Sequence, residues 1–111
     1  HFAGAFPVWL SPVQVKLLPI TDRAAAYADQ VAVQLDAAGY RVETDHRNEK
    51  IGKKIREAQL EKVPYMLVIG DKEAEAGTVS VRHRADGDLG VMPLADFQKM
   101  LKDDVDSKVI K

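Results

Sequence analysis

The sequence contains no cysteine, and this absence excludes disulfide bonds, thiolate metal sites and cysteine nucleophiles. Aromatic residues make up only 6% of the chain, so stacking on aromatic rings cannot dominate the binding of any ligand. No apolar run is long enough to cross a membrane. With 46% apolar and 30% charged residues, the composition is typical of a globular domain, and the lack of cysteine fits a cytoplasmic location.

The first ten residues, HFAGAFPVWL, are apolar but do not resemble a targeting segment. Pro7 interrupts them, and the basic front of a signal peptide is missing. The sequence also lacks an initiator Met, so we expect a fragment of a longer protein. We assign residues 1–12 to the end of a preceding domain and a linker, and residues 13–111 to one domain, with Trp9 packed against this domain or its missing neighbour.

The first half of the chain shows two strand-then-helix units. Val13–Ile20 is β-branched and bounded by prolines, which predicts a strand. Thr21 or Asp22 then caps a helix that stops at Gly39. The apolar positions of this helix recur every three or four residues: Ala24, Ala28, Val31, Leu35 and Ala38.

The second unit begins with a strand over Tyr40–Asp45. Asn48 is expected to cap the helix that follows, whose apolar residues are Ile51, Ile55 and Ala58. Lys53 and Arg56 fall on its opposite, solvent-facing side.

The second half predicts a buried strand, a loop, a hairpin and a last helix. YMLVIG has the length of a central strand, and DKEAEAG then forms a loop. TVSVRHRA alternates, with Val79, Val81 and His83 on one face, and DGD turns the chain toward LGVMP. The final helix is spaced by Leu94, Phe97, Leu101 and Val105.

This order, β-α-β-α-β-β-β-α, predicts an α/β fold. We expect a mixed five-stranded sheet, parallel in its first three strands with right-handed crossovers, and helices covering both faces.

Catalytic patterns are missing from the sequence. The histidines His1, His46 and His83 do not have metal-ligand spacing. Neither a GxGxxG nor a GxxxxGK[ST] loop is present. The neighbouring acids Asp103 and Asp104 are interpreted as part of a solvated helix face. The chain is therefore not expected to be an enzyme or to hold a metal.

The segment HRNEKIGKKIR, residues 46–56, is the most unusual stretch. It holds five basic residues and one acid, a charge of +4, in a chain whose formal net charge is −1. Such a local excess predicts attraction for a polyanion at one patch. The alternative is an ordinary solvated helix face.

An acid close to this patch could read a nucleobase. In an open α/β sheet, ligands bind at the carboxyl ends of the parallel strands, where both Asn48 and the segment Gly70–Gly77 are expected. The amino end of the second helix would favour a phosphate there. Glu73, as an acceptor-only carboxylate, can take two hydrogen bonds from the Watson-Crick edge of guanine.

Three segments carry a resemblance to a known family. FPVWLSPVQVKLLPITD, DHRNEKIGKKIREAQLEKVPYMLVIGDKE and VSVRHRADGDLG closely resemble the carboxy-terminal anticodon-binding domain of bacterial-type threonyl-tRNA synthetase. Prolyl, glycyl and histidyl synthetases carry related but less similar domains. The resemblance implies a three-layer α/β/α domain with a five-stranded sheet and three helices.

The implied function is recognition of the threonine anticodon, in which the middle G and the final U are constant. Glu73 would read the guanine with Arg82 near the same base, and Asn48 and Lys62 would serve the uridine. The full set of residues that the resemblance assigns to tRNA binding is Asn48, Lys50, Lys53, Arg56, Lys62, Lys72, Glu73 and Arg82.

One position departs from the family pattern. Many relatives carry two basic residues just before VPYM, where this chain has Glu61 and Lys62. A charge contact with RNA would be missing or reversed there. Lys50 and Lys53 would still supply attraction for phosphates.

The resemblance places catalysis elsewhere in the complete synthetase. ATP, Mg and Zn would belong to its catalytic core, with residues 1–12 as the end of that core and a linker. The chain itself would be a monomer without cofactors, and the parent a homodimer through the core. Two alternatives remain: an accessory protein-interaction module of the same fold, or the equivalent domain of a prolyl or glycyl synthetase.

Overall fold

A computed structural model describes residues 8–107, apart from the side chains of Trp9 and Ser107. Its centre is a five-stranded sheet in the order β2-β1-β3-β4-β5. The strands are β1 (Val15–Pro19), β2 (Val42–Thr44), β3 (Tyr65–Ile69), β4 (Thr78–His83) and β5 (Gly87–Pro93). β1 pairs in parallel with β2 and β3, whereas β3–β4 and β4–β5 are antiparallel, so the predicted mixed sheet is confirmed.

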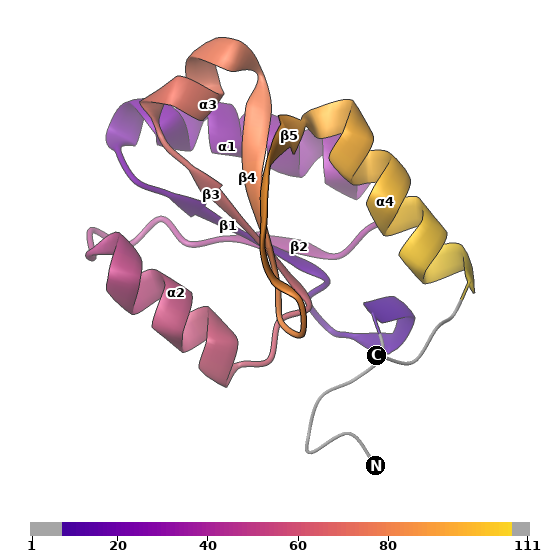
Figure 1. Ribbon diagram of the computed structural model, residues 1–111. Helices are drawn as coiled ribbons and strands as arrows, with labels where there is room; N and C mark the ends of the chain where they lie inside the picture. The colour runs from indigo at the N-terminus through magenta and orange to yellow at the C-terminus, as the bar shows by residue number, and fades with distance from the viewer. Residues whose placement is uncertain (1–7, 108–111) are drawn as a thin grey trace.

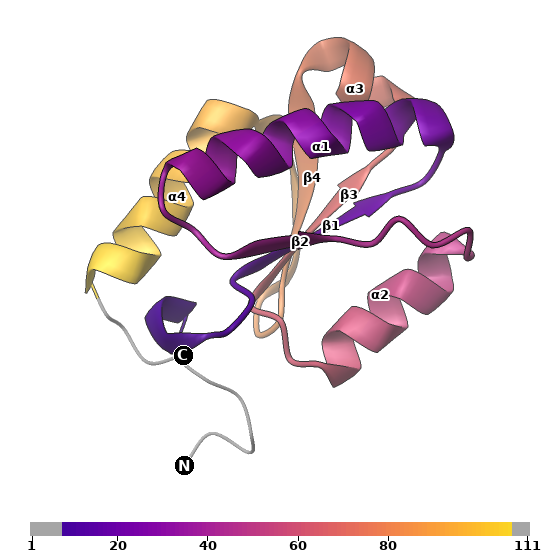
Figure 2. The ribbon, with the colours of Figure 1, turned by 180° about the vertical axis from the view of Figure 1, so that it is seen from behind.

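Helices cover both faces of this sheet, as Figures 1 and 2 show from opposite sides. One face carries α1 (Asp22–Ala37) and α4 (Leu94–Ser107), and the other carries α2 (Ile51–Leu60). A short 3-10 turn, η1 (Val8–Leu10), lies beside α4. The expected three-layer α/β/α architecture is therefore confirmed.

The two faces differ in how much apolar surface they bury. Among the described residues, fourteen buried apolar side chains form the core beneath α1 and α4, including Leu17, Leu67 and Phe97. The cluster under α2 has three: Leu18, Ala58 and Met66. Because hydrophobic stabilisation scales with buried apolar area, α2 is the more weakly packed helix.

The helix α1 follows its sequence pattern closely. Thr21 is the N-cap, and its Oγ1 accepts a hydrogen bond from Ala24 N at 3.1 Å. Gly39 ends the helix with φ of +96°, a left-handed conformation that favours glycine. The predicted core positions are buried except Ala38, which is exposed because it already lies beyond the last helical turn.

Two expectations about helices were wrong. DKEAEAG is not a loop but contains a fourth helix, α3 (Asp71–Ala76), which begins after Gly70 and ends at Gly77 with φ of +71°. Asn48 does not cap α2, because the helix starts three residues later with Lys50 as N-cap and without a side-chain cap. Residues 8–107 thus hold four α-helices rather than the three implied by the resemblance.

The expected hairpin is present at the sheet edge. Val79, Val81 and His83 of β4 are buried, and β5 pairs with β4 through an irregularity between Val81 and Arg82. In α4, Phe97 and Leu101 are fully buried, as their spacing predicts.

The expectation that Asp104 is solvated was also wrong. Its exposed fraction is 6%, and it accepts a hydrogen bond of 2.5 Å from the Tyr65 hydroxyl. Burial and this carboxylate together raise the pKa of Tyr65 above its ordinary value. Asp103, one residue earlier, is exposed as expected.

Lys16 occupies an unusual place for a lysine, in the middle of the sheet. Its side chain is 7% exposed, and Nζ lies 2.8 Å from Glu61 Oε1 and 3.1 Å from Glu43 Oε1. Burial disfavours its charge, but the hydrogen bonds to Glu61 and Glu43 outweigh this and raise the pKa of Lys16. Glu61 therefore neutralises a buried cation and joins the end of α2 to β1.

We expect Glu61→Lys to lower the free energy of unfolding by about 2 kcal/mol, because it replaces a partner of the buried Lys16 with a like charge. Urea unfolding measures this loss. Glu61→Gln retains an acceptor and should lose less than half as much. Equal stability of the lysine variant and the wild type would show that Glu61 does not compensate Lys16.

Within residues 8–107, none of the helices has the length and apolar character needed to cross a membrane.

Candidate functional site

The carboxyl ends of the three parallel strands lie together at one end of the sheet, called the sheet edge from here on. β2 leads into residues 45–50, which carry Asn48, and β3 leads through Gly70 into α3, which carries Lys72 and Glu73. β1 lies between these strands, so the carboxyl ends of β2 and β3 are about 10 Å apart, twice the strand spacing. The structure thus brings Asn48, Lys72 and Glu73 to one edge, as the topology predicted.

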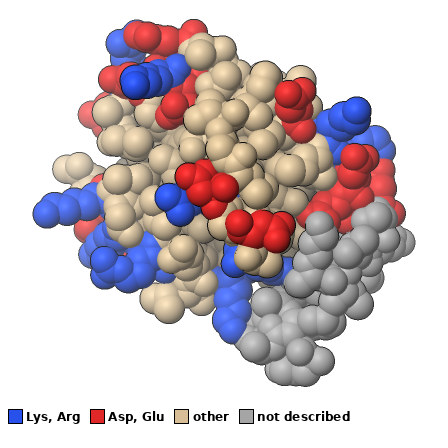
Figure 3. Space-filling model, viewed as in Figure 1, with Lys and Arg blue, Asp and Glu red and all other residues tan. Residues whose placement is uncertain are grey.

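Helix α2 presents a row of cations to solvent. Lys50, Lys53 and Arg56 are all exposed, and Figure 3 shows the Lys and Arg side chains gathered over α2 at the lower left. Lys53 Nζ lies 3.3 Å from Glu49 Oε2. The expected basic face of this helix is therefore present.

Two of the five basic residues in segment 46–56, Arg47 and Lys54, make hydrogen bonds between segments of the protein. Arg47 donates to Asp45 through Nε at 2.9 Å and Nη2 at 2.7 Å, and to Glu57 Oε1 at 2.6 Å. The hydrogen bonds from Arg47 to Asp45 outweigh the effect of burial and lower the pKa of the Asp45 carboxyl to about 2.

Lys54 is the second of them, and its exposed fraction is only 4%. Its Nζ donates to the carbonyls of Pro19 and Asp45, both at 3.1 Å. The charge count of residues 46–56 included Lys54 in the basic patch. A signal was available, because position 54 is three residues after Ile51 and four before Ala58, on the apolar side of the helix.

Glu73 is held by the start of its own helix. Its Oε1 accepts a hydrogen bond of 2.7 Å from Gly70 N, which satisfies one of the free amides at the amino end of α3. The carboxylate is half-buried, and Lys72 beside it is exposed. Because an ionised carboxylate has about four acceptor sites, Glu73 keeps capacity for further donors.

Arg82 and Lys62 lie toward the other end of the sheet, where the parallel strands begin. Arg82 pairs with Met66 of β3, so it shares the face that α2 covers. Gly70 lies four residue steps after Met66, so the Arg82 backbone is about 13 Å along the sheet from the start of α3. Lys62 follows α2 with φ of +60°, and its carbonyl accepts from Arg84 Nη1 at 3.1 Å.

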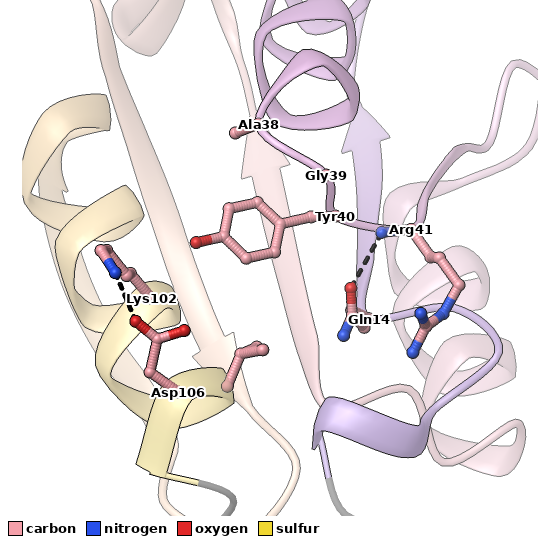
Figure 4. A pocket seen from close by; sticks show the side chains of 8 residues that line it. Gln14, Ala38, Gly39, Tyr40, Arg41, Lys102 and Asp106 are labelled. Atoms are coloured by element: carbon pink, nitrogen blue, oxygen red, sulfur yellow. Dashed lines mark hydrogen bonds and ion pairs between the residues drawn. The ribbon is translucent and has the colours of Figure 1, made fainter.

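Two of the hollows among the described residues lie at opposite ends of the sheet. A small one of about 60 Å³ lies beside Ile20, Asn48 and Lys54, at the edge that carries the predicted residues. A larger one of about 480 Å³ lies between the segment after α1 and the helix α4, where Tyr40 points toward Lys102 and Asp106 (Figure 4). None of the predicted site residues lines the larger hollow.

In the part of the chain that the structure describes, no group of three or more His, Asp or Glu side chains is arranged to hold a metal ion.

Comparison with protein families gives one match, described as an anticodon binding domain, over residues 14–104. The chain is 59% identical over 110 residues to the threonine–tRNA ligase of Syntrophomonas wolfei and 63% identical over 108 residues to that of Acetivibrio thermocellus. These alignments include 99% and 97% of the chain but 17% of each relative. The chain thus spans about a sixth of the length of these relatives.

Solved structures give a consistent result. The RNA-binding domain of threonyl-tRNA synthetase from Cryptosporidium parvum superposes with a TM-score of 0.88 at 35% identity, over 94% of this chain and 26% of that one. A prolyl-tRNA synthetase from the same organism has a TM-score of 0.80 at 24% identity, over 94% of this chain and 23% of its own. The prolyl enzyme supports the fold alone.

Proposed function

The chain belongs to the anticodon-binding domain family, and from this membership we propose that it binds the anticodon loop of a threonine tRNA for a threonine–tRNA ligase. The high identity to threonine–tRNA ligases supports the choice of amino acid. The observation that carries the proposal is the exposed basic row of α2 next to a sheet edge that carries Asn48 and Glu73. Cations attract the RNA backbone, and the polar side chains at the edge can contact bases.

Within this proposal the residues divide into two groups. Lys50 and Lys53 bind phosphates with their exposed charges, and Arg56, exposed on the same helix, belongs with the anticodon readers. Glu73 reads the middle guanine with its free acceptor capacity, and Asn48 contacts the final uridine. Lys72 adds charge beside Glu73.

Arg82 and Lys62 complete the proposed surface on the α2 side of the sheet. Because the Arg82 backbone lies about 13 Å along β3 from the start of α3, its long side chain has to extend along the sheet to reach a base near Glu73. The contact of Lys62 with RNA is affected by its neighbour Glu61, an acid where many relatives have a basic residue. Glu61 pairs with Lys16 and does not add a positive charge beside Lys62.

Catalysis, with ATP, Mg and Zn, is proposed to belong to parts of the ligase outside this chain. The same holds for the dimer contacts of the parent enzyme, so the chain alone is expected to be a monomer. Residues 1–7, which we assign with residues 8–12 to the end of the catalytic domain and a linker, lie outside the described residues, as does the side chain of Trp9.

Binding to a threonine anticodon stem-loop tests the function. We expect the chain to prefer this stem-loop over versions with the middle G or the final U replaced, by about 1 to 3 kcal/mol per base. Affinity should fall with salt, and Lys50→Ala should reduce the salt slope by about 0.7 to 0.9. Lys99→Ala, an exposed lysine on α4, is the control. Equal binding to every loop would favour the protein-interaction alternative, and preference for a proline or glycine anticodon would favour those synthetases.

A further inference from the structure

The buried lysine of α2 is the starting point for an inference that rests on the proposed function. Lys54 is 4% exposed in the middle of a helix whose neighbouring cations, Lys53 and Arg56, are in solvent. Removing an ammonium group from water is costly unless acceptors replace its hydration. Such a residue needs a structural reason.

The hydrogen bonds of Lys54 connect three separate segments of the chain. One N–H group of the ammonium points to the carbonyl of Pro19, the last residue of β1, and another to that of Asp45, the first residue after β2. The lysine stem comes from α2. A single cation therefore ties α2 to the carboxyl ends of two parallel strands.

This tie fixes the segment that carries Asn48. Asp45 is held through its carbonyl by Lys54 and through its carboxylate by Arg47, and Arg47 also reaches Glu57 on α2. Residues 46–50 are thus anchored at both ends.

Apolar packing alone does not fix the position of α2 on the sheet. Among the described residues, the cluster between α2 and the sheet has three buried members, Leu18, Ala58 and Met66, and its other members, Ile51, Ile55 and Val68, are only partly buried. Nonpolar contacts have little directionality, and a cluster this small permits a helix to shift or rotate. Hydrogen bonds from one ammonium to two fixed carbonyls restrict both movements.

We propose that Lys54 is a positioning residue for anticodon recognition: it holds Asn48 and the basic row of α2 in fixed relation to Glu73 across the sheet edge. It does so without touching the RNA. Its contribution to binding is preorganisation, which lowers the entropy lost when the loop docks.

The neighbouring Lys53 supplies a matched control, because it is the same residue type on the same helix with its side chain half exposed. Lys54→Met and Lys53→Met are compared with the wild type in binding to stem-loops with a middle G or A across a salt series. Lys53→Met should weaken both loops alike and reduce the salt slope by about 0.7 to 0.9. Lys54→Met should leave the slope unchanged, weaken the G loop about 10-fold and reduce the G-over-A preference.

Amide hydrogen exchange on the free proteins provides a readout that does not depend on RNA. Lys54→Met should speed exchange in residues 46–60 relative to the remainder of the chain, whereas Lys53→Met should not. If Lys54→Met proves too unstable, Lys54→Arg keeps the charge but changes the donor geometry and should show the same pattern in weaker form.

The results separate the two proposals. A wild type that does not prefer the G loop removes the proposed function, while the exchange data still test the tie made by Lys54. A wild type that prefers G, with a Lys54→Met variant that has a reduced salt slope and intact preference, would make Lys54 a phosphate contact and overturn the inference. Unchanged binding or unchanged exchange in Lys54→Met would overturn it as well.

Discussion

Glu73→Gln is expected to remove most of the preference for guanine at the middle anticodon position, a loss of about 1 to 3 kcal/mol or about 5- to 150-fold in the G-over-A affinity ratio. The reason lies in how the structure uses the two carboxylate oxygens. Oε1 accepts from Gly70 N at 2.7 Å, and glutamine can retain this bond through its own oxygen. The other oxygen becomes an NH2 group, which cannot accept a hydrogen bond from guanine.

The conservative change separates base reading from helix capping. Glu73→Ala removes both functions and should also destabilise α3 by about 1 kcal/mol. Glu75→Gln on the same helix is the control, because Glu75 is exposed and pairs with Arg23 at 3.1 Å. Binding of G and A stem-loops is measured for all three variants. If Glu73→Gln weakens both loops equally, Glu73 contributes affinity but does not discriminate bases.

Asp45→Asn is expected to lower the free energy of unfolding by about 2 to 3 kcal/mol at pH 7. The side chain of Asp45 is 3% exposed and accepts from Arg47 at three atoms. Hydrogen bonding by Arg47 is the main reason that the pKa of Asp45 falls to about 2, from an ordinary value near 3.8. Each pKa unit corresponds to about 1.4 kcal/mol, which gives the expected magnitude.

The same carboxyl makes stability depend on pH. Because the pKa of Asp45 is lower in the folded than in the unfolded chain, its contribution is present above about pH 4 and is lost as the pH falls toward 2. Urea unfolding between pH 7 and pH 2 should show the gap between wild type and Asp45→Asn closing over this interval. Asp103→Asn, at an exposed position of α4, should run parallel to the wild type. A constant gap would mean that Asp45 acts through packing rather than charge.

Local pattern was a good guide to the elements of the fold and to their order. Apolar spacing located α1, α2 and α4, and continuous or alternating apolar runs located the strands, because side-chain direction repeats along a helix or strand. The helix α3 was not predicted, because DKEAEAG is short and has no apolar face. It is stabilised by the local hydrogen bond from Gly70 N to Glu73 and by a contact from a distant segment, in which Thr21 Oγ1 donates to Asp71 at 2.8 Å.

The candidate site was predicted in part. Sequence placed Asn48, Lys72 and Glu73 at one sheet edge and Lys53 and Arg56 on the outer face of α2, as the structure has them. Whether these side chains contact the anticodon stays a prediction. Charge counting overestimated the patch, because it cannot distinguish a cation exposed to RNA from one that is buried, such as Lys54, or paired with carboxylates, such as Arg47.

The sequence by itself determined the strands and most of the helices in their order along the chain, and with them the α/β architecture. It also located the basic segment. Each of these follows from residues that are close together in the chain. Only the tertiary structure decided that Lys54 is buried, that Asp104 meets Tyr65 and that Glu61 pairs with Lys16 across 45 positions. Each of these depends on partners that folding brings from distant segments. The energy of a charged group depends on those partners and on its burial, which a local pattern does not specify.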